Sequence, residues 1–94
     1  PVYCDGFTER LLAIVNAFYR RDTTNVIVPC EQLMSEPALT RDYNHQVKLR
    51  LVLARIAWVT GDSQRANREY AKLIDDETFG EEAKARAMQQ GRFE

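Results

Sequence analysis

The sequence predicts an all-α fold of about five helices, arranged as stacked antiparallel helical hairpins. Residues 47–59 and 63–75 both have the hydrophobic spacing of a helix, and the connection between them is too short to be anything but a turn between antiparallel neighbours. The first of these two helices is apolar on most sides, so other helices must cover it. Two further helical patterns, at 7–20 and 81–90, are available to do so.

Length and composition indicate one folded domain. The chain has 94 residues, of which 45% are hydrophobic and 29% charged, as in a folded domain and unlike a disordered tail. Its net charge of −1 gives no electrostatic reason to expect nucleic-acid or membrane-surface binding. No run approaches the roughly 18 apolar residues that span a bilayer, so membrane insertion is not expected. Because the first residue is proline and no signal peptide is visible, we expect a piece of a longer protein, with a leader or linker remnant at 1–6 and one domain at 7–90.

The first hairpin is predicted at 7–36, and its first helix at 7–20. The broad apolar face of that helix consists of Leu11, Leu12, Ile14, Val15, Phe18 and Tyr19. Asp5 or Thr8 can cap its beginning, and Arg20 and Arg21 stand where a helix end favours cations.

The second helix of this hairpin lies within 24–35. Pro29 leaves two alternatives for it. Either the helix contains the proline and is kinked by it, or the helix begins later, with Pro29 in its opening turn. The segment 37–46 that follows is either a long loop or a short helical turn, and Leu39 and Tyr43 can plug the end of the core.

The second hairpin is predicted at 47–75. Its second helix is amphipathic, with Ala66, Tyr70, Leu73 and Ile74 on the apolar side and Gln64, Arg65, Arg68, Glu69 and Lys72 left for solvent. The acidic run 75–77 then ends the apolar pattern as a solvated helix boundary. The last helix, 81–90, begins with acids and has Gly91 placed as a stop. It is either a terminal cap on the second hairpin, which we favour, or the first helix of a further repeat.

Small and aromatic residues follow a recognisable order in the second hairpin: Ala54, Ala57, Gly61, Asp62, Ala66, Tyr70 and Leu73. This order resembles a tetratricopeptide repeat, and the resemblance implies a right-handed stack of hairpins. Arg50 and Leu53 depart from it, because the family often has Trp and Leu there, and no proline closes the second helix. The alternative is a plain helical hairpin with the same turn.

The first hairpin reads as a degenerate copy of the second. The matching pairs lie 40 residues apart and are Ile14 with Ala54, Ala17 with Ala57, Val26 with Ala66, Cys30 with Tyr70 and Leu33 with Leu73. Pro37 stands where the family commonly ends its second helix. Because the family's period is shorter, the additional residues are expected in the connection 37–46.

Few residues of this chain suggest chemistry. His45 is the only histidine, in the expected connection between the hairpins, and the four glycines are single, so neither a multi-histidine metal site nor a phosphate loop is indicated. The acidic runs 75–77 and 81–82 lack the spacing of a calcium loop. We therefore expect no catalytic residue, no bound metal and no cofactor.

The two cysteines leave the compartment open between two alternatives. Cys4 and Cys30 are 26 residues apart and fit no metal or redox spacing. A disulfide between them would indicate an oxidising, periplasmic or extracytoplasmic location. A buried thiol at Cys30 and a free one at Cys4, in the cytoplasm, is the reading we favour.

The function that remains is binding, and the resemblance implies where. In tetratricopeptide arrays the first helix of each hairpin lines a groove that takes a peptide or helix of a partner protein. Transferred to this chain, the groove positions are Leu11, Val15, Phe18, Tyr19, Lys48, Leu51, Arg55 and Trp58, with Thr8, Val52 and Val59 beside them. Tyr19, Arg55 and Trp58 are of the types that dominate interface energies, although Trp58 is also a candidate for the core. The clamp that holds a C-terminal carboxylate in chaperone-binding members needs Lys and Asn, and Leu11, Val15 and Leu51 stand in such places.

Two other functions fit the same sequence. One is a self-association or regulatory domain of a bacterial signalling or transcription regulator, in which a second copy covers the apolar helix. The other is a structural spacer. The leading expectation is a non-catalytic protein-protein interaction module whose apolar groove takes an amphipathic helix or an apolar peptide.

Overall fold

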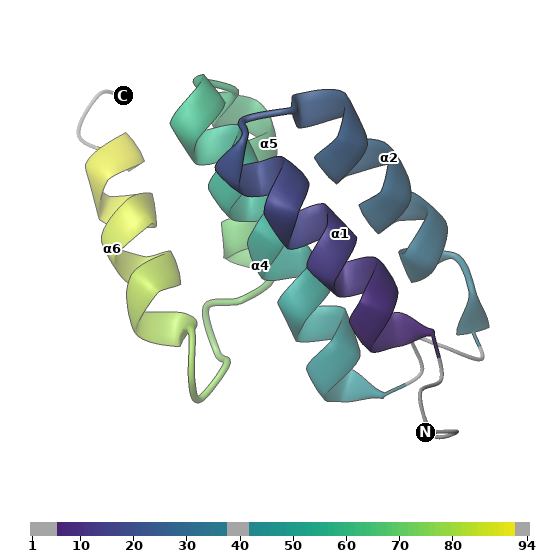
Figure 1. Cartoon of the computed structure of the whole chain (residues 1–94). Helices are drawn as coiled ribbons and strands as arrows, with labels where there is room; N and C mark the ends of the chain where they lie inside the picture. The colour runs from purple at the N-terminus through teal and green to yellow at the C-terminus, as the bar shows by residue number, and fades with distance from the viewer. Residues whose placement is uncertain (1–5, 38–41, 92–94) are drawn as a thin grey trace.

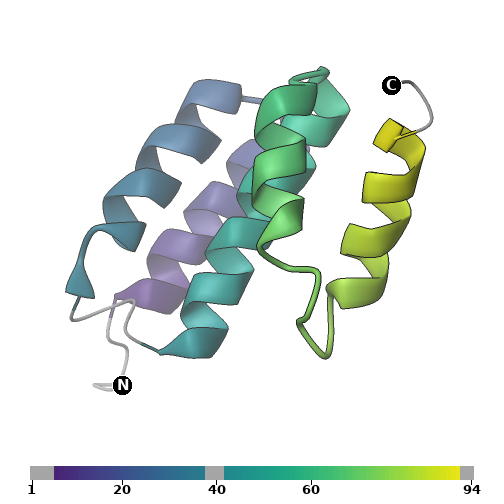
Figure 2. The same ribbon diagram turned by 180° about the vertical axis from the view of Figure 1, so that it is seen from behind.

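The structure, a computed structural model, describes residues 6–37 and 42–91. Its helices are α1 (Phe7–Tyr19), α2 (Thr23–Met34), α4 (Tyr43–Thr60), α5 (Ser63–Ala71) and α6 (Gly80–Gly91). The described residues contain no strand, so the predicted all-α class is confirmed. Helices α1 and α2 form one antiparallel hairpin, α4 and α5 form a second, and α6 lies beyond α5 at the end of the row (Figures 1 and 2).

Helix α4 is the centre of this arrangement. It packs against α1 and α2 on one side and against α5 on the other. One core cluster joins α1 and α2 to α4 and consists of Phe7, Ile14, Ala17, Val26, Cys30, Leu33, Leu49, Leu53 and Ile56. The other joins α4 to α5, α6 and the turn between them and consists of Val47, Leu51, Ala54, Ala57, Ala66, Tyr70, Leu73 and Ala83. The expected need for cover on most sides of this helix is thus met by three different helices.

The turns within the two hairpins have the same construction, 40 residues apart. Asp22 caps α2 by accepting the backbone N–H of Asn25, and Asp62 caps α5 by accepting that of Arg65. The N–H of each aspartate donates to the carbonyl of an alanine five residues earlier, at 2.9 Å to Ala17 and 2.8 Å to Ala57.

The residue before each cap is left-handed, at φ 57° for Arg21 and 87° for Gly61. All ten residues of the five pairs expected from the sequence are buried. The contacts between neighbouring helices fit an arrangement of stacked hairpins. The two hairpins therefore share one turn construction and bury the same five pairs of positions.

Helix α2 follows the first of the two alternatives considered for it, because it contains Pro29. It begins at Thr23, one residue earlier than expected and well before Pro29, so the proline lies inside the helix. The later start with Pro29 in the opening turn is wrong. Proline inside a helix removes one backbone hydrogen bond at a cost of about 3 kcal/mol. The complete burial of Val26, Cys30 and Leu33 on the same helix offsets that cost.

Helix α4 begins at Tyr43, four residues before the expected start of the second hairpin. Tyr43 is exposed, so it does not plug the core, while Leu39 lies outside the described residues. His45 belongs to the first turn of α4 and not to a loop, and its ring stacks on that of Phe7 at 3.7 Å between centroids. Glu69, expected in solvent, is buried because it pairs with Arg50 at 3.0 Å.

The ends of α1 and α6 also differ in detail from the prediction. Gly6 precedes α1 without a side-chain cap, so Thr8 is not the cap, and Asp5 lies outside the described residues. Helix α6 begins at Gly80, where a Cβ would stand 2.7 Å from the carbonyl oxygen of Ile74. Gly91 is the last residue of the helix and not the residue after it.

Cys30 is a buried free thiol whose sulfur lies 3.8 Å from the carbonyl oxygen of Leu49. Burial raises the pKa of the Cys30 thiol to about 12. Cys4 lies outside the described residues. None of the described helices combines the length and apolar character needed to cross a membrane.

The shared turn predicts equal effects at its two copies. Replacing Asp22 or Asp62 with alanine removes a helix N-cap, and each change should lower the free energy of unfolding by about 1 kcal/mol. Urea denaturation followed by circular dichroism measures this. Asp75→Ala, at an exposed aspartate that caps no helix, is the control and should have little effect. A large loss from only one of the two cap variants would contradict the equivalence of the turns.

Candidate binding face

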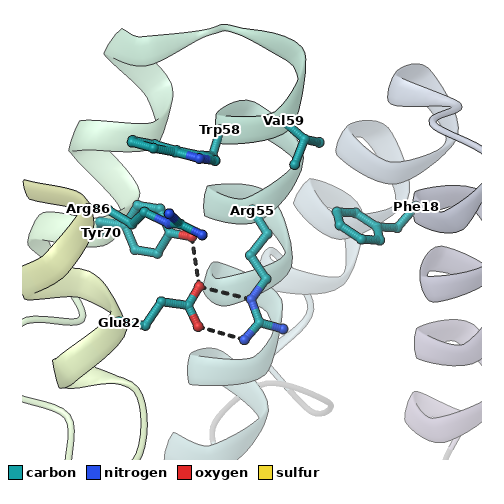
Figure 3. Close-up of a pocket in the computed structure, with 7 residues that line it drawn as sticks. All are labelled: Phe18, Arg55, Trp58, Val59, Tyr70, Glu82 and Arg86. Carbon is teal, nitrogen blue, oxygen red and sulfur yellow. Dashed lines mark hydrogen bonds and ion pairs between the residues drawn. The ribbon is translucent and has the colours of Figure 1, made fainter. Parts of the chain in front are cut away.

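The first helices of the two hairpins and α6 surround a hollow of about 340 Å³. Its lining residues come from four helices and are Phe18, Arg55, Trp58, Val59, Tyr70, Glu82 and Arg86 (Figure 3). Segments far apart in the sequence thus meet at one place on the surface, where α1 and α6 flank α4.

Glu82 is the polar centre of the hollow. Its carboxylate accepts hydrogen bonds from Arg55 Nε at 3.0 Å and from Arg55 Nη2 at 2.6 Å. The same carboxylate accepts the hydroxyl proton of Tyr70 at 2.8 Å (Figure 3). One side chain of α6 is therefore bonded to both helices of the second hairpin.

The protonation states of these groups suit the hydrogen bonds they make. The Arg55 guanidinium, by donating to it, holds the pKa of Glu82 below its usual value. Burial, and then the hydrogen bond to Glu82, raises the pKa of Tyr70 to about 12. At neutral pH the site therefore holds an ionised carboxylate, a protonated phenol and a charged guanidinium.

Trp58 forms the aromatic wall of the hollow. Its ring meets that of Tyr70 edge to face, with centroids 6.5 Å apart, and the Arg86 guanidinium carbon lies 4.6 Å from its centroid. Trp58 also packs against the core cluster around α5 and is only partly buried. It consequently belongs both to the edge of the core and to the surface, which joins the two alternatives considered from the sequence.

Beside the hollow, α1 and α4 present matching outward stripes. Thr8, Leu12, Val15 and Tyr19 have the spacing of one face of α1, and 40 residues later Lys48, Val52, Arg55 and Val59 repeat it on α4. The apolar side chains in these stripes include some of the most exposed of the described residues, at 57% for Leu12, 74% for Tyr19 and 46% for Val59. The stripes extend the apolar surface away from the hollow.

We call the two stripes and the hollow the binding face. Of the residues expected in the groove, Phe18, Arg55 and Trp58 line the hollow, whereas Tyr19 and Lys48 are exposed in the stripes. The remaining three are less exposed. Val15 is half-buried, Leu11 packs against the core cluster that joins α1 and α2 to α4, and Leu51 is only 5% exposed. Leu11 and Leu51 are therefore in neither the stripes nor the hollow, and both lie outside the face.

Four residues of the face were missed from the sequence. Tyr70 was assigned to the core, Leu12 was not placed in the groove, and Glu82 and Arg86 were regarded as part of a solvated terminal helix. The one available signal was the spacing of Glu82 and Arg86, four residues apart on a helix of few apolar residues.

The acidic run 75–77 does more than mark a helix boundary. Asp76 accepts the backbone N–H groups of Thr78 and Phe79, which form the turn before α6, and it also accepts the hydroxyl of Tyr43. Its carboxylate is thus used within the chain. Within the described parts of the chain, no group of three side chains is placed to hold a metal ion.

Glu82 should make stability depend on pH. Its pKa is lower in the folded chain than the ordinary 4.5 expected after unfolding, so the carboxylate stabilises the fold above that value and loses its effect as the pH falls through the folded pKa. Glu82→Gln should cost about 1–2 kcal/mol at neutral pH and progressively less in acid. Thermal unfolding of both proteins between neutral and acidic pH measures the difference.

Glu81→Gln is the matched control, because Glu81 is also in the first turn of α6 and has the same relation to the helix dipole, but it is exposed. Equal loss of stability in the two variants would show that the dipole, and not the contact with Arg55 and Tyr70, accounts for the effect of Glu82.

Comparison with protein-family models, curated proteins and solved structures gave no match for this chain. The likeness of residues 47–74 to a tetratricopeptide repeat therefore remains a prediction from the sequence.

Proposed function

We propose that the chain is a non-catalytic protein-protein interaction module that holds a peptide or helix of a partner protein against the binding face. The observation that carries this proposal is the hollow between Phe18 and Trp58, continued by the exposed side chains of Leu12, Tyr19 and Val59. Clustered exposed apolar and aromatic side chains are typical of interaction surfaces. A partner segment would remove them from water at about 25 cal/mol per Å² of apolar area.

The face is also held in place before any partner arrives. Glu82 fixes the Arg55 guanidinium through two hydrogen bonds, and the Arg86 guanidinium lies over the ring of Trp58. Side chains that are already ordered lose less conformational entropy on binding. Arginine and tryptophan, two of the residue types that contribute most to interfaces, are therefore presented in a defined geometry.

The chemistry of the described titratable groups supports a binding role over catalysis. Tyr70 and Cys30 both have a pKa of about 12, and Cys30 is buried in the core. His45 stacks on Phe7 near the start of α4, whereas the hollow is lined by residues near the end of that helix. Glu82, the ionised carboxylate of the hollow, has a lowered pKa and already accepts three hydrogen bonds from Arg55 and Tyr70, which makes it a weak base.

Selection of peptides from a random display library, with the chain immobilised, tests this function. Selected peptides should bind the wild-type chain and lose affinity at least about tenfold on Val59→Asp, because the substitution places a charge in the apolar stripe of α4. Fluorescence anisotropy with the synthesised peptides measures the affinities.

Val28→Asp is the matched control, since Val28 on α2 has the same 46% exposure as Val59 but lies outside the binding face. Equal losses in the two variants, or a library that yields no binder, would contradict the proposal. Sedimentation equilibrium of the chain alone checks the self-association alternative, which a micromolar dimer dissociated by Val59→Asp would favour. A monomer that binds no peptide would favour the structural spacer.

A further inference from the structure

We infer that the partner segment is acidic as well as apolar, and that it places side-chain carboxylates along Lys48, Arg55 and Arg86 while its apolar side chains cover Phe18, Trp58 and Val59. This inference rests on the proposed function, because it names the chemical class of the segment that the binding face would hold.

The binding face carries a net positive charge. The stripe on α1 is uncharged, while the stripe on α4 and the hollow contribute Lys48, Arg55, Arg86 and a single acid, Glu82. The whole chain carries −1, so the positive charge of this face runs against the balance of the molecule. A segment with carboxylates would be steered to it and held in register.

The Arg55 guanidinium has one side turned away from Glu82. Glu82 takes up Nε and Nη2, and Nη1 points away from it, toward the side where Phe18 lies (Figure 3). The Arg55 side chain is 45% exposed. A carboxylate can therefore approach from the open side without displacing Glu82, next to the aromatic ring that would pack against an apolar neighbour.

The positive charge is spread along helix α4. Lys48 and Arg55 are seven residues apart on α4, about 10 Å along the helix axis. One terminal carboxylate cannot reach both, whereas acidic side chains at intervals along a segment can. The arrangement thus favours an internal acidic stretch over a chain end.

The same charges disfavour a second copy as the occupant. In a two-fold dimer the binding face would meet its own equivalent, which brings Lys48 and Arg55 of one copy toward the same basic surface of the other. Like charges across an interface oppose association. A foreign acidic segment meets no such penalty.

Three fluorescent peptides of about 14 residues, long enough to span ~21 Å as helices, test the inference. All have Leu and Phe at the same helical positions and are acetylated and amidated at their ends. They differ only at the remaining positions, which are all Glu in one peptide, all Gln in the second and all Lys in the third. By anisotropy at ~50 mM salt, the Glu peptide should bind about tenfold more tightly than the Gln peptide and more tightly still than the Lys peptide, and this preference should shrink at ~500 mM.

Single substitutions test which residues of the binding face cause the preference for the Glu peptide. Lys48→Gln, at an exposed residue of the α4 stripe, should reduce the preference for the Glu peptide about two- to fivefold. Arg55→Gln should reduce it further. Lys72→Gln is the control, because Lys72 is also exposed but borders a separate hollow lined by α2, α4 and α5, and it should change nothing.

The inference and the proposed function can fail separately. Equal binding of Glu and Gln peptides, both lost on Val59→Asp, would overturn the acidic class and leave a purely apolar groove. A Gln peptide with a free C-terminal carboxylate that binds as tightly as the Glu peptide would also overturn it, in favour of a chain end. If none of the three designed peptides binds while library-selected peptides do, the inference fails and the proposed function stands.

Discussion

The burial of α4 is the constraint on which the rest of the structure depends. This helix has apolar residues on opposite sides, with Leu49, Leu53 and Ile56 in one core cluster and Ala54 and Ala57 in the other. Leaving either side exposed would be unfavourable, because the free-energy cost grows with the apolar area in contact with water. One hairpin partner, α5, covers only one side, and the α1/α2 hairpin is needed for the other. The order of the helices in the molecule follows from this requirement.

The small residues of α4 decide how close its partners come. Ala54, Ala57 and Ala66 are all buried and let α4 and α5 approach, and the ring of Tyr70 then fills the space toward α6. In the first hairpin Ile14 and Val26 take the places of two of these alanines, and Cys30 takes the place of the tyrosine. The first hairpin thus has larger side chains where its helices face each other and a smaller one at the position of Tyr70. The turn built on Asp22 or Asp62 keeps its hydrogen bonds in both hairpins. Degenerate cores can therefore share one hairpin geometry.

The contact that docks α6 also shapes the proposed binding face. Among the described side chains of α6, those of residues 80–87, Ala83 is the apolar one buried in the core, so the attachment of the helix depends on the Glu82 network as well. Glu82 is only a quarter exposed, and its carboxylate is compensated by Arg55 and Tyr70. Because the same hydrogen bonds orient Arg55 toward the open side, the proposed recognition would depend on the contact that stabilises α6. A partner that engages Arg55 would meet a side chain whose position α6 has already set.

The sequence by itself determined the class of fold, the helix α1, the turn at Gly61 and Asp62 and the ten buried residues of the five matching pairs, because helical periodicity and cap chemistry are local properties. Tertiary structure decided the rest. It placed Pro29 inside α2, since long-range burial outweighs a local preference against proline there, and it buried Glu69 against Arg50, 19 residues away. It also joined Arg55 to Glu82 across 27 residues, so that three of the expected groove residues line a hollow while Leu51 turns into the core. No local pattern specifies such pairs, because a charged residue on a helix reads as solvent-facing until its partner is brought next to it by the packing of other elements.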